Sequence, residues 1–218
     1  MIMRKKNQVL FRLSIIMNVI VIIGILGFLY KNTHKKNEQA VSDRAYNVVM
    51  FGNSLTAGGN WNQELNRLNV KNSGFPGFTT SHFVWLLNDE VLKFKPKICF
   101  IEGGINDIGV GIPLKRTCEN YEAIVETLMK NKIEPVLQST LYVHRPDDSI
   151  MNSAADSLNY FLASLASRKN LLYLNLNQFL SENKRLKEEF TTDGTHLKES
   201  AYKIWIREIE KILKRKGI

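Results

Sequence analysis

The chain has 218 residues and a net charge of +9, and its 44% apolar and 23% charged residues suit one α/β domain with an appendage. Four basic residues stand within the first twelve positions, and elsewhere no basic run is interleaved with aromatic side chains. This distribution argues against a nucleic-acid partner.

Residues 13–30 form an amino-terminal run of eighteen uncharged residues. As a helix, with a rise of about 1.5 Å per residue, the run spans most of a ~30 Å hydrocarbon core. A cleaved signal peptide is the alternative, but no Ala-x-Ala arrangement follows the run. We therefore predict a transmembrane anchor at 13–30, a cytoplasmic basic segment at 1–12, a polar tether at 31–44 and an extracytoplasmic domain at 45–218.

The stretch around Ser54 follows a short apolar run, Tyr46–Met50, which has β-branched residues and no charge. Such a run predicts a buried parallel strand, and a helical pattern follows it. A serine between strand and helix lies at the carboxyl edge of the sheet, where open α/β folds bind ligands. Ser54 is therefore a candidate nucleophile, and a turn serine or helix N-cap is the alternative.

The rest of the chain alternates short apolar strands with helical stripes. Strands are expected at 70–72, 97–101, 135–139 and 171–174, and helices at 61–68, 83–91, 117–129, 158–165 and 201–213, with Thr117 as the cap of the third helix. This alternation predicts an α/β fold in which helices cover both faces of a parallel sheet through right-handed crossovers.

A histidine close to the last helix can supply the base that a serine nucleophile needs. His196 follows Asp193 by three residues across a glycine turn, so the carboxylate can reach the imidazole ring. The oxyanion needs hydrogen-bond donors, and the candidates are the N–H groups of Ser54 and Gly74 and the amide of Asn106. All three are expected at the carboxyl ends of strands.

Four short blocks resemble those of the SGNH (GDSL-like) hydrolases, in the same order: Gly52–Leu55, the loop Asn72-x-Gly74-x-x-Gly77, Gly104–Asp107 and Asp193–His196. The resemblance runs from Tyr46 to the carboxyl terminus. It implies a three-layer flavodoxin-like fold with about five parallel strands, Ser54 as nucleophile, His196 as base and Asp193 as the third triad member. It also implies Ser54, Gly74 and Asn106 as oxyanion donors. The family usually has Asp where this chain has Asn53.

Further residues stand in loops near the expected site. His144 and Arg145 follow the fourth strand and are candidates for binding the substrate or for a solvated loop. Phe75 and Phe78, with Trp61, are candidates for lining an acyl or sugar pocket, and packing against neighbouring elements is the alternative. Asp107 is expected to be a structural acceptor.

Neither a disulfide nor a metal site is expected. Cys99 and Cys118 are predicted near opposite ends of a strand, beyond disulfide reach, and neither has metal-site spacing. No cofactor is needed.

Together these features predict a membrane-anchored serine esterase that acts on an acylated glycan or lipid. Acetyl esters of carbohydrate at the outer side of the membrane are the expected substrates. The alternatives are a lysophospholipase or acyl thioesterase, and a catalytically idle glycan-binding envelope protein.

Overall fold

The computed structural model describes residues 22–30, 46–65, 69–146 and 148–218. The chain divides into two compact units, Met1–Arg44 and Ala45–Ile218. In the first unit, residues 22–30 form a helix with exposed side chains. No helix among the described residues is both long enough and apolar enough to span a bilayer. The predicted segments 1–12 and 31–44, and residues 13–21 of the predicted anchor, lie outside the described residues.

The second unit is built on a five-stranded parallel sheet, as the sequence predicts. The strands are β1 (Val48–Gly52), β2 (Val70–Gly74), β3 (Ile98–Glu102), β4 (Glu134–Gln138) and β5 (Leu172–Leu174). Their order across the sheet is β2-β1-β3-β4-β5, the flavodoxin-like order.

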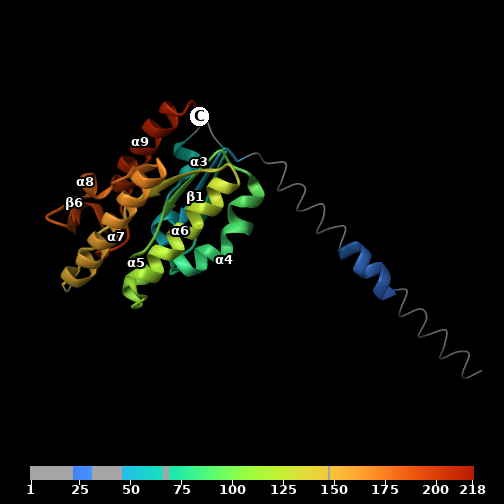
Figure 1. Cartoon of the computed structure of the whole chain (residues 1–218), viewed down its shortest axis with the longest axis horizontal. Helices are drawn as coiled ribbons and strands as arrows, with labels where there is room; N and C mark the ends of the chain where they lie inside the picture. The colour runs from blue at the N-terminus through green and yellow to red at the C-terminus, as the bar shows by residue number, and fades with distance from the viewer. Residues whose placement is uncertain (1–21, 31–45, 66–68, 147) are drawn as a thin grey trace, which may run out of the picture. The chain divides into compact units, whose positions relative to one another are not determined.

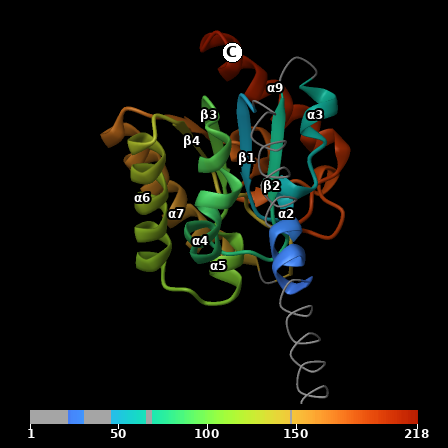
Figure 2. The same cartoon turned by 90° about the vertical axis from the view of Figure 1, so that its right-hand side faces the viewer.

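Three long helices, α4 (Thr80–Glu90), α6 (Leu114–Lys130) and α7 (Asp148–Lys169), cover one face of the sheet. The other face packs against α9 (Glu199–Arg215) and the short α3 (Trp61–Glu64). Figures 1 and 2 show these two sets of helices on opposite sides of the strands. The sheet is therefore the middle of three layers.

Strand side chains alternate between the two cores. In β1, Val48 and Met50 join the cluster around α9, whereas Val49 and Phe51 join the cluster around α4, α6 and α7. Because both faces are covered, all five residues of β1 are buried. This explains why an uninterrupted apolar run marks this strand in the sequence.

Several short elements lie at the ends of the strands. They are α2 (Ser54–Ala57), η1 (Leu92–Phe94), α5 (Ile105–Gly109), α8 (Asn177–Leu180), β6 (Ser181–Glu182), β7 (Arg185–Leu186) and η2 (Glu188–Phe190). The antiparallel hairpin of β6 and β7 has only two residues per strand and was not predicted. Strands this short carry no periodic signal.

One local prediction is wrong, and one pair of alternatives is decided. Thr117 does not cap α6, which begins at Leu114; instead its hydroxyl group donates to Asp107. Trp61 does not line a pocket, because only 1% of it is exposed and its ring packs edge-on against Trp205. Both side chains serve contacts with another helix, which local patterns do not reveal.

The register of the sheet aligns the ends of three strands. Gly52 pairs with Gly74 on one side and with Glu102 on the other. The segments that follow β1, β2 and β3 therefore leave the sheet at one edge. Ser54, the loop after Gly74 and Asn106 all belong to these segments.

Candidate active site

Ser54 is the first residue of α2, directly after the buried strand β1. Asn53 caps this short helix, because its Oδ1 accepts a hydrogen bond of 2.8 Å from the Leu55 N–H. The turn thus fixes the backbone of Ser54 on both sides. The Ser54 hydroxyl group lies at the edge of the sheet, 3.2 Å from His196 Nε2.

Asp193 and His196 complete a line of hydrogen bonds from Ser54. His196 Nδ1 lies 2.7 Å from Asp193 Oδ2 and donates to it, so Nε2 is left as the acceptor for the Ser54 hydroxyl group. The Nδ1 hydrogen bond, with support from the backbone N–H groups of His196 and Thr195, holds the pKa of Asp193 well below its usual range. The carboxylate therefore stays ionised near neutral pH and favours this imidazole tautomer.

The loop that carries the histidine is held by short contacts. Gly194 adopts a positive φ of 86°, and its carbonyl group accepts a 2.7 Å hydrogen bond from the His144 N–H. A Cβ atom at Gly194 would lie only 2.1 Å from the His144 carbonyl oxygen. The loop can approach residues 144–145 this closely only because residue 194 is glycine.

Asn106 and Gly74 stand at the same edge, but they differ as oxyanion donors. Asn106 Nδ2 donates to the Phe78 carbonyl group at 2.9 Å, and its second hydrogen is available for an oxyanion. The Gly74 N–H donates to Asn72 Oδ1 at 3.0 Å, so it would have to share its hydrogen with the substrate. A Cβ atom at Gly74 would lie 2.2 Å from Ala57 N, so glycine is required there for packing as well. The oxyanion roles stay predictions.

Phe75 and Phe78 form a stacked pair with ring centroids 5.4 Å apart. Both rings are half-buried, and Phe78 also packs on the ring of His82. A ring nitrogen of His82 accepts a hydrogen bond from the N–H of Thr79, which forms part of the capping box of α4. The pair lies beside Asn106 through the Phe78 carbonyl group. It is therefore near the site, and its contact with substrate stays a prediction.

His144 and Arg145 differ in what they leave free. His144 Nδ1 lies 2.8 Å from the Leu186 carbonyl oxygen, so this nitrogen is engaged. Arg145 Nε donates to Thr195 Oγ1 at 2.9 Å, next to His196 in the chain. Among the described residues no carboxylate forms a salt bridge with the Arg145 guanidinium group, and Arg145 is exposed.

Asp107 is a structural acceptor, as the sequence predicts. The buried Asp107 carboxylate accepts from the N–H of Thr80 with both oxygens and so ties α5 to the start of α4. Cys99 and Cys118 are free thiols. In the part of the chain that the structure describes, no group of three or more His, Cys, Asp or Glu side chains could hold a metal ion.

Sequence analysis missed one residue of this region, Glu102. It ends β3 and is completely buried beneath the Ser54 turn, where it contacts Asn53 and Thr56. The sequence holds a signal for it, since an acidic residue is rare at the end of an apolar buried strand.

Residues 50–204 match the model of the GDSL-like Lipase/Acylhydrolase family. The match spans more than half of the chain, and the chain belongs to this family. The domain is therefore a hydrolase of the serine esterase type.

The curated relatives that the chain matches are much longer than the aligned region. The N-acylneuraminate cytidylyltransferase of one Streptococcus agalactiae strain, serotype V, is 25% identical over 118 residues, which cover 51% of this chain and 28% of the relative. That of a serotype III strain is 22% identical over 203 residues, which cover 87% of this chain and 47% of the relative. The chain thus spans less than half the length of the curated relatives it matches. The remaining parts of these relatives are not aligned with this chain.

Solved structures share the fold. A GDSL-like lipase from Bacteroides thetaiotaomicron superposes with a TM-score of 0.70 at 24% identity, covering 80% of this chain and 90% of that one. An acetylxylan esterase from Geobacillus stearothermophilus gives 0.66 at 16% identity, covering 76% and 93%. At these identities the likeness establishes the fold alone.

Proposed function

We propose that this family member is an acetylesterase that removes acetyl groups from carbohydrate at the outer side of the membrane. The observation that carries the proposal is the unbroken line of hydrogen bonds from Ser54 through His196 to Asp193 on an open edge of the sheet. The His196 and Asp193 side chains are half-exposed, so a hydrated and bulky alcohol group such as a sugar can approach them.

The mechanism follows from these contacts. Ser54 Oγ attacks the ester carbonyl carbon while His196 Nε2 takes its proton, and the Asp193 carboxylate stabilises the imidazolium. The free hydrogen of the Asn106 amide and the Ser54 N–H stabilise the oxyanion. His196 then returns the proton to the leaving sugar oxygen, and the acetyl group stays on Ser54. Water, activated by His196, hydrolyses this acetyl-enzyme and restores the serine.

The position of Arg145 favours a substrate sugar that carries a carboxylate. Its guanidinium group is anchored beside His196 by Thr195 and has terminal donors free for a planar anion. The names of the curated relatives mention N-acylneuraminate, which is an acidic sugar, and some structural neighbours are acetylxylan esterases, which act on a neutral sugar polymer. These neighbours support an acetyl ester of carbohydrate, and Arg145 favours the acidic one.

Activity assays test the proposal. We expect hydrolysis of p-nitrophenyl acetate, with activity falling as the acyl chain lengthens, and covalent labelling of Ser54 by a fluorophosphonate. O-acetylated N-acetylneuraminic acid should be hydrolysed faster than an acetylated xylo-oligosaccharide. If the folded protein showed no labelling and no turnover, the result would instead favour the idle glycan-binding alternative.

A matched pair of arginine variants tests the charge of the substrate. Arg145→Gln should raise KM for the acidic substrate by about tenfold or more, since a charge-assisted hydrogen bond is lost, and leave p-nitrophenyl acetate unaffected. Arg168→Gln, on the last turn of α7, is the control. Equal effects of both variants would argue for a neutral substrate.

A lipid substrate is the second candidate, and its support is a shallow hollow of about 510 Å³ between the starts of α6 and α7, half of whose lining residues are apolar. It is lined by Leu114, Ile150, Ala154 and three serines, and Ile150 is 79% exposed. A rise in kcat/KM from acetyl to octanoyl esters would favour this lysophospholipase or thioesterase function.

Anchoring and location are part of the same proposal. Their support is the uncharged run at 13–30 with four basic residues before it. A reporter fused after Ile218 should be active only if it is one that works outside the cytoplasm. A freely soluble mature protein that begins after residue 30 would contradict the anchor.

A further inference from the structure

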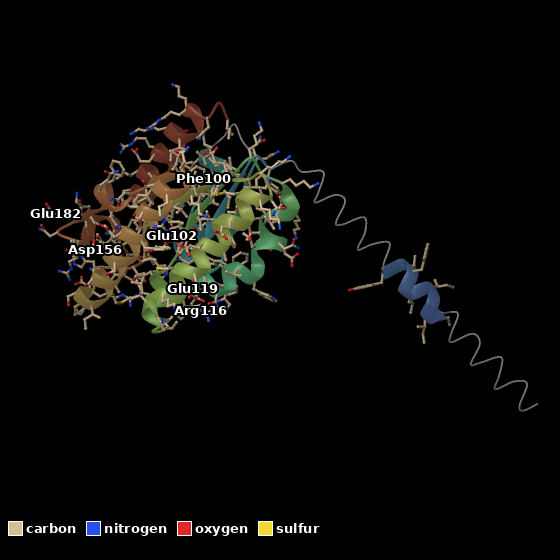
Figure 3. All side chains as sticks on the ribbon, viewed as in Figure 1. Phe100, Glu102, Arg116, Glu119, Asp156 and Glu182 are labelled. Atoms are coloured by element: carbon tan, nitrogen blue, oxygen red, sulfur yellow. The ribbon has the colours of Figure 1, made fainter. Side chains whose placement is uncertain are left out.

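Glu102 is a buried acid directly beneath the nucleophile turn. It is the last residue of β3, its exposed fraction is 0%, and the sheet register sets it beside Gly52, two residues before Ser54. Figure 3 shows Glu102 within the outline of the domain, whereas Glu182 lies at its margin. The catalytic mechanism does not use this carboxyl group, so its presence needs another reason.

The carboxyl group contacts both neighbours of the turn. Asn53 Nδ2 donates to Glu102 Oε1 at 3.4 Å, and Thr56 Oγ1 lies 3.4 Å from Oε2. Asn53 precedes Ser54 and Thr56 follows it by two residues, and both are completely buried. The contact with Nδ2 also determines which end of the Asn53 amide faces the Leu55 N–H.

We propose that Glu102 is a positioning residue for Ser54, and that the pair at positions 53 and 102 holds the nucleophile turn as long as no more than one of the two residues is a carboxyl group. The acid accepts a hydrogen bond from the amide, and the amide or acid at position 53 accepts from the Leu55 N–H. In this way the pair fixes the orientation of the turn from below. The proposal rests on the proposed function only in taking Ser54 as the nucleophile.

The surroundings of Glu102 favour its neutral form. Burial raises the pKa of Glu102 to about 8, although the hydrogen bonds from Thr56 and Asn53 lower it. Two titratable side chains interact electrostatically with Glu102, namely Tyr121 of α6 and Tyr202 of α9, and burial raises the pKa of both. Asp107 of α5 interacts electrostatically with Tyr121 as well. No salt bridge to Glu102 exists among the described residues.

A neutral acid suits this place for a chemical reason. An oxyanion develops close to Ser54 during catalysis, and a carboxylate beneath it would oppose that negative charge. The protonated carboxyl group keeps one acceptor for Asn53 and can donate its hydrogen to Thr56. Two carboxyl groups at positions 53 and 102 would instead face each other at about 3.4 Å, and only one of them could ionise easily.

Exchange of the two groups tests the pair. The variants are Glu102→Gln, Asn53→Asp and the double variant that carries both changes. The matched control is Glu208→Gln, which changes another buried glutamate, on α9, whose partners are Arg207 and Lys211. The readouts are kcat and KM on p-nitrophenyl acetate from pH 6 to 9, the rate of fluorophosphonate labelling, and circular dichroism.

The expected results separate positioning from folding. Asn53→Asp should lose about tenfold or more in kcat and in labelling rate at pH 8, with KM little changed, and should recover towards pH 6 as one carboxyl group takes a proton. The double variant should return to within about threefold of the wild type. Glu102→Gln should also stay within that range at pH 7, and its activity should decline less above pH 8.

Two results would overturn the proposal. One is Asn53→Asp with wild-type rates across the pH range, and the other is a double variant no better than Asn53→Asp. If Asn53→Asp does not fold, the double variant decides: it should fold and label, and failure of both would reject the pair. If the wild type labels but does not hydrolyse the ester, the proposed function fails, while the labelling rates still test the positioning.

Discussion

The nucleophile turn at residues 53–56 and the base loop at residues 191–197 support the same triad in different ways. The turn rests on buried contacts of Asn53 and Thr56 with Glu102, which is 49 and 46 positions away in the sequence. The loop is organised by hydrogen bonds within three residues of Asp193, and its side chains are half-exposed. Changes of the half-exposed Asp193 and His196 side chains should therefore alter rate with little change in stability, whereas changes near the turn should alter rate and stability together.

The largest expected effect belongs to the base loop. His196→Ala should lower kcat by about four powers of ten or more, since loss of a triad member leaves only binding and the oxyanion donors. Thermal stability should change little because the side chain is half-exposed. The measurement is kcat on p-nitrophenyl acetate together with a melting curve.

His144→Ala is the control for that variant. His144 Nδ1 is engaged with the Leu186 carbonyl group, so its loss should lower stability by about 1 kcal/mol and leave kcat within about threefold. If His144→Ala were the inactive variant and His196→Ala kept its activity, the assignment of the base would be wrong.

Asn106 lies on the side of the nucleophile and should couple rate to stability. Asn106→Ala should cost about 10²–10³ in kcat, or roughly 3–4 kcal/mol, through loss of an oxyanion donor, with KM little changed. It should also lower the free energy of unfolding by about 1 kcal/mol, because the Phe78 carbonyl group loses its donor. Asn106→Asp should lose more activity at pH 7, since a carboxylate repels the oxyanion.

The check is kcat, KM and circular dichroism on all three proteins. A folded Asn106→Ala that kept kcat within about threefold of the wild type would remove the donor role.

A smaller effect is expected from Gly194→Ala. The positive φ and the contact with the His144 carbonyl oxygen should displace the loop, lowering kcat by about tenfold and stability by about 1–3 kcal/mol. Gly77→Ala is the matched control, because Gly77 has a φ of 79° and no atom within 4 Å of an added Cβ. Equal loss of activity in both variants would mean that the close contact at Gly194 does not set the loop.

The smallest effects, in stability against pH, should have opposite signs in the two regions. Unfolded Glu102 loses its proton near 4.5 and folded Glu102 near 8, so its contribution to stability falls as pH rises through this window. The pKa of Asp193 is lowered on folding, so its contribution is present above its usual value of 3.8 and is lost as pH falls. The melting temperature should therefore fall as pH rises through the first window and fall as pH drops through the second.

Two variants separate these contributions. Glu102→Gln should make the melting temperature depend less on pH on the alkaline side. Asp193→Asn should make it depend less on pH on the acid side. A wild-type melting temperature that does not fall between pH 5 and 8 relative to Glu102→Gln would mean that Glu102 is ionised when folded.

Much of the fold was predictable because its signals are local. The uncharged apolar run at 46–50 indicates a strand covered on both faces, and the stripe of α6 indicates a helix with one buried side. Asp193 and His196 are three residues apart, so their contact needs only a turn. The departure from the family pattern at Asn53 is also visible in the sequence.

Tertiary structure decided what depends on distant residues. Only the sheet register brings Glu102 beneath Asn53, and only the packing of Trp61 on Trp205 removes that ring from the site. The engagement of the Gly74 N–H with Asn72, and of His144 with Leu186, likewise depends on how loops meet. A sequence specifies which groups can form hydrogen bonds, but the partner that each one finds is set by the folded arrangement of the whole chain.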